Sequence, residues 1–416
     1  MDQCLMSWRG RGLAILARWY PVPLLAFHVV AGVALLGYYL AIADTTPYDN
    51  FRIYYAAAES ALGGGIQYRP SYYSYVYQPP TVVVFVPFTF LPFEIATVLW
   101  RVLNVAVLVV LGTLVWQWVE YLDVTPEDRA ARPLVFATLL AGTWSLLLLL
   151  NAQMDIALAT LVWAGLYWLE TGSERRAGVA VAIAASVKVF PAVLGVWFLV
   201  RRQFEAVAAA IATGAGIVAV GLFVFGPDQY RRYFRVVVEF RDYAALLDGV
   251  PDPNSELLSI ARPVAAASGG LPYVWLLVAG LVVTACTLAV VFVNVDPTDR
   301  RERFATALVT VLVAVVALPT GQNSYTFYAV PGLVVALFVV SGRWPRALVG
   351  GGFALLAVPL DPEELLRLRD VAAPGAVPAV FAALETMLTV ASVELYGFAL
   401  AVAGLALFVG VPRWRG

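Results

Sequence analysis

The chain has 416 residues, of which 61% are hydrophobic and 13% charged, and its formal net charge is −1. Soluble domains average about 45–50% apolar and about 25% charged residues, so this composition excludes a soluble globular protein and predicts an integral membrane protein. The small net charge gives no support for a nucleic-acid partner. Cys4 lies in a basic tail and Cys286 in an apolar run, and no Cys or His spacing typical of a metal site is present.

The N-terminal tail contains Arg9, Arg11 and Arg18, so the positive-inside rule places it in the cytoplasm. The first apolar stretch, residues 22–43, has no small-residue cleavage site after it, and we interpret it as a retained span. Farther along, apolar stretches alternate with arginine-rich loops. We therefore expect an all-α, multi-pass bundle in the cell membrane, with residues 1–416 as one membrane domain and about eleven transmembrane helices plus re-entrant and interfacial helices.

A polar loop at residues 44–93 follows the first span and is expected to be external. Ionisable groups kept at the mouth of a span usually have a function there. Asp49 is our candidate catalytic base, because a carboxylate at the membrane surface can deprotonate a hydroxyl group; Asp44 is the competing candidate. The alternative is that Asp49 or Asn50 caps a helix that follows it. Arg52, about one turn farther on, could orient the carboxylate or meet a phosphate.

The stretch at residues 177–200 lies between two arginine pairs, at 175–176 and 201–202, and both pairs favour the cytoplasm. Two half-helices of roughly eleven residues would each rise about 16 Å, which is half a bilayer. We therefore predict a re-entrant hairpin with Lys188 at its tip; the alternative is one span kinked at Pro191. A lysine in such a hairpin needs an anion or a cavity, unless it snorkels from a span end.

A second external segment, residues 226–271, is expected to form the active-site face together with the loop at residues 44–93. Its part from Tyr230 to Tyr243 mixes charged and apolar residues, as a helix lying on a membrane surface does. Between two predicted spans, a short corner carries Gln153 and Asp155. These two side chains either bind hydroxyl groups of an acceptor or satisfy backbone groups at two helix ends.

Four segments of the chain resemble motifs of glycosyltransferase family 87, the polyprenyl-phosphate-mannose-dependent alpha-mannosyltransferases of the GT-C class. They are YDNFRIYYAAAESALGGGIQY with the following YVYQPPTVVVFVPFTFLP, then AQMDIALATL, VKVFPAVL and PNSELLSI. Two departures stand out. Asn50 occupies the place directly before the aromatic residue where the family usually has Asp, and Phe327 stands where many members carry His. The resemblance implies that any phosphate contact of that His falls to Gln322, Asn323 or Tyr325, or is absent.

The resemblance implies a membrane glycosyltransferase that moves a hexose, mannose in that family, from a polyprenyl-phosphate donor to a glycan or glycolipid acceptor. Transfer would invert the anomeric centre on the extracytoplasmic face, with Asp49 as base and the donor phosphate held by Lys188 with Arg52 or Arg262. We expect no metal and no cofactor, and we expect membrane lipids as partners. The open alternatives are a transporter or flippase of a polyprenyl-linked sugar and a GT-C relative with another donor.

Substrate contacts are expected mainly from tyrosines and amides on the external side. The Tyr-rich part of the first loop suits sugar stacking, although an aromatic belt at the membrane interface is the better explanation for most of these tyrosines. The residues expected to contact substrate are Tyr54, Tyr55, Tyr77, Gln153, Asp155, Asn254, Gln322, Asn323 and Tyr325.

Overall fold

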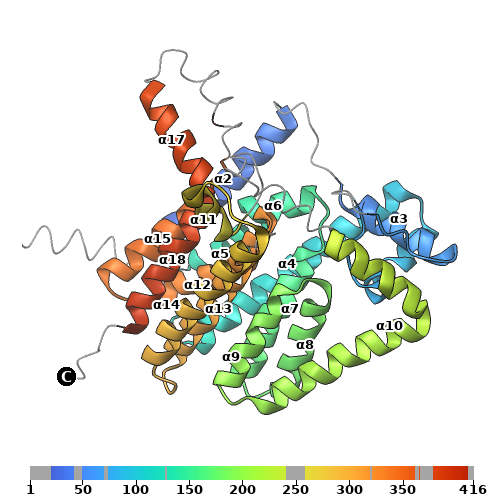
Figure 1. Ribbon diagram of the computed structural model, residues 1–416. Helices are drawn as coiled ribbons and strands as arrows, with labels where there is room; N and C mark the ends of the chain where they lie inside the picture. Colours follow the sequence, from blue (N-terminus) through green and yellow to red (C-terminus); the bar gives the residue numbers. More distant parts are fainter. Residues whose placement is uncertain are drawn as a thin grey trace, which may run out of the picture.

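The computed structural model describes residues 20–41, 49–69, 74–126, 129–239, 258–318, 321–360, 365 and 378–410. The regular elements in these ranges are α-helices and short 3-10 helices, as the composition predicted (Figure 1). Two of the candidate site residues, Asp44 and Asn254, lie outside the described residues.

The described part of the chain contains the following helices. In chain order they are α2 (Pro21–Ala41), α3 (Phe51–Leu62), η1 (Pro79–Val84), η2 (Val86–Phe90), α4 (Phe93–Tyr121), α5 (Ala131–Ala141), α6 (Thr143–Leu150), α7 (Asp155–Glu170), α8 (Glu174–Val187), η3 (Phe190–Val193), α9 (Leu194–Val200), α10 (Phe204–Glu239), α11 (Ala261–Ser268), α12 (Tyr273–Asn294), α13 (Arg300–Ala317), η5 (Asn323–Tyr328), α14 (Val330–Val339), α15 (Arg343–Leu355), α17 (Pro378–Val390) and α18 (Val393–Gly410).

Among the described residues, 6 helical segments are long and apolar enough to cross a membrane. They are Pro21–Ala41, Phe93–Tyr121, Ala131–Leu150, Phe204–Val237, Val274–Asn294 and Val393–Gly410. The expected count of about eleven is not confirmed by this measure, because several apolar helices are short. For example, α7 has 16 residues and α8 has 14, which corresponds to about 24 and 21 Å against a hydrocarbon core of about 30 Å.

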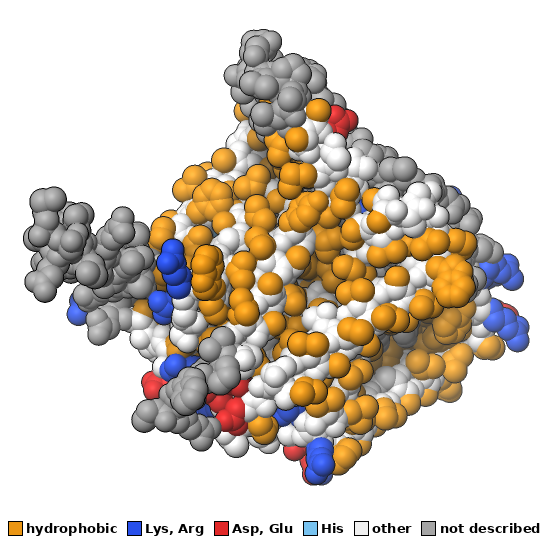
Figure 2. Space-filling model, turned by 60° about the vertical axis from the view of Figure 1, so that its left-hand side comes forward, with side chains coloured by type: hydrophobic (Ala, Val, Ile, Leu, Met, Phe, Trp, Pro, Cys, Tyr) orange, Lys and Arg blue, Asp and Glu red, His pale blue; other side chains and the backbone are white. Residues whose placement is uncertain are grey.

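The surface of the bundle is largely apolar. Figure 2 shows hydrophobic side chains over most of one face, with charged side chains gathered near its margins. Large residues such as Val102 on α4 and Phe223 on α10 are 59% and 92% exposed. A contiguous apolar surface of this extent belongs against lipid, which fits a multi-pass membrane protein.

The chain turns back at Lys188, as the predicted hairpin requires, and does not continue as one kinked helix. Helix α8 ends at Val187, Lys188 adopts an extended conformation, and η3 and α9 carry the chain back. The two ends of the hairpin meet, since Arg175 Nε lies 3.1 Å from Glu205 Oε2. Pro191 has no backbone N–H to donate to a continued α8, which explains the break near this position.

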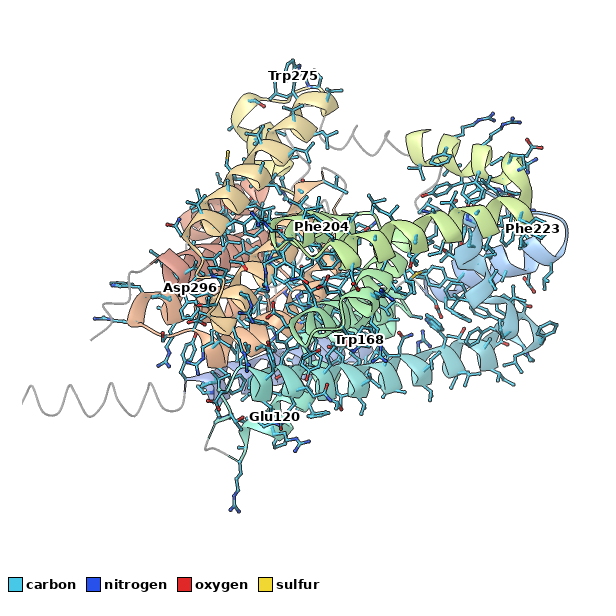
Figure 3. All side chains as sticks on the ribbon, turned by 90° about the horizontal axis from the view of Figure 1, so that it is seen from below. Glu120, Trp168, Phe204, Phe223, Trp275 and Asp296 are labelled. Atoms are coloured by element: carbon cyan, nitrogen blue, oxygen red, sulfur yellow. The ribbon has the colours of Figure 1, made fainter. Side chains whose placement is uncertain are left out.

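Helix α10 bends at Gly226, where the backbone has φ 79° and ψ 164°. Glycine reaches this region without the cost of a Cβ. Before the bend, α10 runs from Phe204 to a point beside the first-loop helices, where Phe223 lies (Figures 1 and 3). After the bend, the chain packs on the first loop, with the Tyr68 and Tyr233 ring centroids 6.1 Å apart. The amphipathic helix predicted from Tyr230 is confirmed as far as Glu239, where the described segment ends.

Candidate functional site

Asp49 lies directly before α3 and is fixed through both of its carboxylate oxygens. Oδ1 accepts a hydrogen bond of 3.0 Å from the backbone N–H of Phe51, and Oδ2 accepts one of 3.1 Å from Arg101 Nη2. The first of these contacts satisfies a free N–H at the start of a helix, so the capping interpretation describes part of the role of Asp49. The side chain of Asp49 nevertheless remains 24% exposed, which leaves the carboxylate accessible to a hydroxyl group.

Arg101, on α4, is the residue of this site that the sequence analysis missed. Its Nε and Nη2 donate hydrogen bonds of 3.2 Å to the backbone carbonyls of Leu149 and Leu150, in addition to the contact with Asp49. The guanidinium group therefore joins the first loop to the end of α6. An arginine inside a mostly apolar 29-residue helix was the available signal, because charged residues in such helices usually have a function.

The corner between α6 and α7 connects Asp49 to the interior of the bundle. The backbone N–H of Asn50 donates to the carbonyl of Asn151 at 2.9 Å, and the indole N–H of Trp100 donates to the carbonyl of Ala152 at the same distance. Gln153 lies in this corner and is half-buried. The first loop and α4 are thus both joined to this corner by hydrogen bonds to its backbone carbonyls.

Asp155 and Lys188 form a buried ion pair at the start of α7 and the turn of the hairpin. Lys188 Nζ lies 2.6 Å from Asp155 Oδ1 and 2.8 Å from Oδ2, and the two side chains are 6% and 1% exposed. The hydroxyl of Tyr328 donates to Asp155 Oδ1 at 2.8 Å. Lys188 Nζ also lies 4.0 Å from the ring centroid of Tyr325. Asp155 therefore supplies the anion that a buried lysine requires.

Two tyrosines of the first loop, one on α3 and one just before η1, lie close to this ion pair. Tyr54 is buried, and its ring packs on Phe85 and on Tyr77, with centroid distances of 4.6 and 5.9 Å. Burial raises the pKa of Tyr54, and the nearby charge of Asp155 raises it further. Burial likewise raises the pKa of Tyr77 well above its ordinary value, with Tyr54 as the next cause. Both phenols therefore remain neutral hydrogen-bond donors at physiological pH.

The 3-10 helix η5 brings further predicted residues to Lys188. Tyr325 contacts both Lys188 and Phe190, the latter at a centroid distance of 5.1 Å. In the described part of the chain, the buried side-chain oxygens of Asn323, Ser324 and Thr326 have no hydrogen-bond partner. Unpaired buried oxygens are costly and rare, so a cluster of them indicates a place where a polar ligand binds. Gln322, which precedes them, is half-buried.

Other predicted residues lie apart from the ion pair. Arg52 is exposed, and its guanidinium carbon lies 4.6 Å from the ring centroid of Phe93. Tyr55 donates to the carbonyl of Leu91 at 2.9 Å, because adjacent residues of a helix point in different directions. Arg262, on α11, is buried and donates to backbone carbonyls at the end of α17, including that of Thr389 at 3.3 Å. Within the described ranges, no group of three His, Cys, Asp or Glu residues could hold a metal ion.

Comparisons with known proteins identify the family of the chain. The profile of glycosyltransferase family 87 matches residues 75–319, which include Asp155 and Lys188 but not Asp49. A polyprenol-phosphate-mannose-dependent alpha-(1-2)-phosphatidylinositol pentamannoside mannosyltransferase of Mycolicibacterium smegmatis is 24% identical over 214 residues, which are 50% of this chain and 50% of that protein. The chain thus matches half the length of this relative. Because the family match covers more than half of the 416 residues, this chain belongs to glycosyltransferase family 87.

Proposed function

We propose that this chain transfers mannose from a polyprenyl-phosphate donor to a glycan or glycolipid acceptor, with inversion, on the extracytoplasmic face of the cell membrane. The proposal rests on the position of two charged side chains, Asp49 and Lys188, on either side of the corner between α6 and α7. An accessible carboxylate, Asp49, lies at the mouth of the bundle, and a buried ammonium group, Lys188, lies behind the same α6–α7 corner. The donor named for the mycobacterial relative supports the choice of sugar.

In the proposed reaction Asp49 takes the proton of an acceptor hydroxyl, and the hydroxyl oxygen attacks the anomeric carbon of the donor. The bond between that carbon and the phosphate oxygen breaks, and polyprenyl phosphate leaves with the bonding electron pair. A positioned base of this kind contributes about 10²–10⁴-fold to the rate. Arg101 holds the carboxylate in place through Oδ2, which keeps it oriented during the proton transfer.

The leaving phosphate gains negative charge, and we assign its stabilisation to Lys188, because Arg52 packs on Phe93 and Arg262 binds carbonyls of α17, apart from the ion pair. Lys188 is already neutralised by Asp155, so hydrogen bonds from neighbouring hydroxyl groups are needed as well. The hydroxyls of Ser324 and Thr326 on η5 flank Tyr325, which contacts Lys188; they are buried and have no partner in the described part of the chain. Tyr54, Tyr77, Gln153 and Asn323 are the proposed sugar contacts around this centre.

The test is an assay of the purified chain with a set of polyprenyl-phosphate hexoses and a panel of glycan and glycolipid acceptors, with the product identified by mass spectrometry. We expect transfer from the mannose donor with inversion. Asp49→Asn should lower the transfer rate by about 10²–10⁴-fold and leave donor binding unchanged. Unchanged transfer by this variant would refute the role of Asp49 as base, whereas lipid translocation without any transfer by the wild type would favour a flippase.

A further inference from the structure

The second part of α10, residues 227–239, which we call the arginine elbow, lies across the end of the bundle that carries Asp49. The bend at Gly226 turns the chain back, so that the hydroxyl of Tyr230 donates to the carbonyl of Val218 at 3.4 Å. The bend divides the candidate segment Phe204–Val237, and the arginine elbow follows the apolar part that ends at Gly226. A helix that begins where a span ends lies at the depth of the lipid headgroups.

One face of the arginine elbow is buried against the first loop. Tyr230, Tyr233 and Val236 recur every three residues and are 5%, 9% and 4% exposed. The ring of Tyr233 packs on Tyr68, which lies in the same loop as Asp49. This face therefore holds the helix against the first loop, and the opposite face is exposed.

The opposite face carries three exposed arginines, Arg231, Arg232 and Arg235. At 100° per residue they fall within about 100° of one another around the helix axis. Arg231 contacts Asp228 at 2.8 Å, but both side chains are more than 70% exposed, so this pair is weak. Phe234, which lies beside the arginines, is 58% exposed. A stripe of arginines flanked by an exposed aromatic residue is the pattern of a helix that binds a membrane surface.

We propose that the arginine face of the elbow binds the phosphate groups of anionic phospholipids in the leaflet on the Asp49 side. Guanidinium groups pair with phosphate through two parallel hydrogen bonds, and anionic headgroups add a net negative charge that zwitterionic headgroups cancel with their own cation. Because the buried face holds the first loop, lipid binding on one side of the helix stabilises that loop on the other. This inference does not depend on which sugar is transferred.

The test is hydrogen exchange of the full-length chain in uncharged detergent micelles titrated with phosphatidylglycerol or with phosphatidylcholine. We expect phosphatidylglycerol, and not phosphatidylcholine, to slow exchange of the amides in the arginine elbow. Replacing the three arginines together (Arg231→Gln, Arg232→Gln and Arg235→Gln) should raise the phosphatidylglycerol concentration for half-maximal protection on the order of 100-fold, since each arginine near an anionic surface contributes roughly fivefold.

The matched control removes the same charge from the other end of the bundle, with Arg175→Gln, Arg176→Gln and Arg202→Gln. This control should leave the half-maximal concentration at the elbow unchanged, and replacing the three elbow arginines by lysine should retain most of the protection. Equal protection by the two lipids in the wild type would overturn the proposal, and so would an unchanged half-maximal concentration in the glutamine variant. The wild-type comparison decides the matter even if the glutamine variant does not fold.

Discussion

Helix α7 carries a buried carboxylate at each end, and the two have very different surroundings. Asp155 begins the helix and pairs with Lys188 and Tyr328. Glu170 ends it and pairs with Arg201 at 2.9 Å and with Arg303 at 2.7 Å. Fifteen residues separate them, or about 22 Å along the helix axis. The two clusters thus mark opposite ends of the bundle.

The difference between the clusters lies in their unused hydrogen-bonding capacity. Both oxygens of Glu170 accept from guanidinium groups, and its side chain is 2% exposed. Around the Asp155 end, by contrast, the described oxygens of Asn323, Ser324 and Thr326 lack partners. A saturated cluster fixes helices in place, whereas an unsaturated one has groups left for a ligand. We therefore expect changes at Glu170 to affect folding and changes at the Asp155 end to affect substrate binding and transfer as well.

The largest effect on stability is expected for Glu170→Ala. It leaves two arginines beside each other without their anion, and breaking a buried pair in this way costs about 3–5 kcal/mol. The measurement is thermal unfolding in detergent. Glu205→Ala is the matched control, because Glu205 is 62% exposed and pairs with an exposed arginine; it should change stability by about 1 kcal/mol or less. Equal losses for the two variants would show that the Glu170 cluster is not a structural element.

A second experiment compares Lys188→Met with the double variant Lys188→Met and Asp155→Asn. The single change leaves Asp155 charged and buried, and we expect it to destabilise the protein by several kcal/mol. The double change removes both charges, so most of the lost stability should return. Sugar transfer should be absent in both the single and the double variant, because both lack the ammonium group. Recovery of transfer along with stability would mean that the ion pair serves packing alone, as we infer for Glu170.

The smallest effect is expected at Arg101, which positions Asp49. Lysine at this position can reach Asp49 but cannot reproduce the fork that also holds the carbonyls of Leu149 and Leu150. We expect Arg101→Lys to lower kcat by about 10- to 100-fold through misplacement of the base, with KM and thermal stability little changed. Arg101→Gln should lower kcat more than Arg101→Lys does. Arg69→Lys, an exposed change in the first loop, should leave kcat unchanged. A rise in KM alone would contradict a positioning role.

Much of the fold could be predicted from local sequence. Apolar stretches of sufficient length mark α2, α4 and α12, because hydropathy and helix length are properties of a segment by itself. The hairpin at Lys188 also followed from local features, namely the two flanking arginine pairs and the nearby Pro191. The number of spans could not be predicted in this way. Helices α7 and α8 are shorter than a bilayer is thick, so length and hydropathy do not decide whether they cross it.

The pairing of charges was decided by the tertiary structure alone. The sequence singled out Asp49, Asp155, Lys188 and Arg262 as unusual in an apolar chain. It did not show that Lys188 pairs with Asp155, that Asp49 pairs with Arg101, or that Arg262 binds the carbonyls of α17. The hydrophobicity of a segment can be calculated from its own residues. An ion pair between distant segments depends on which helices pack together, and only the tertiary structure shows this.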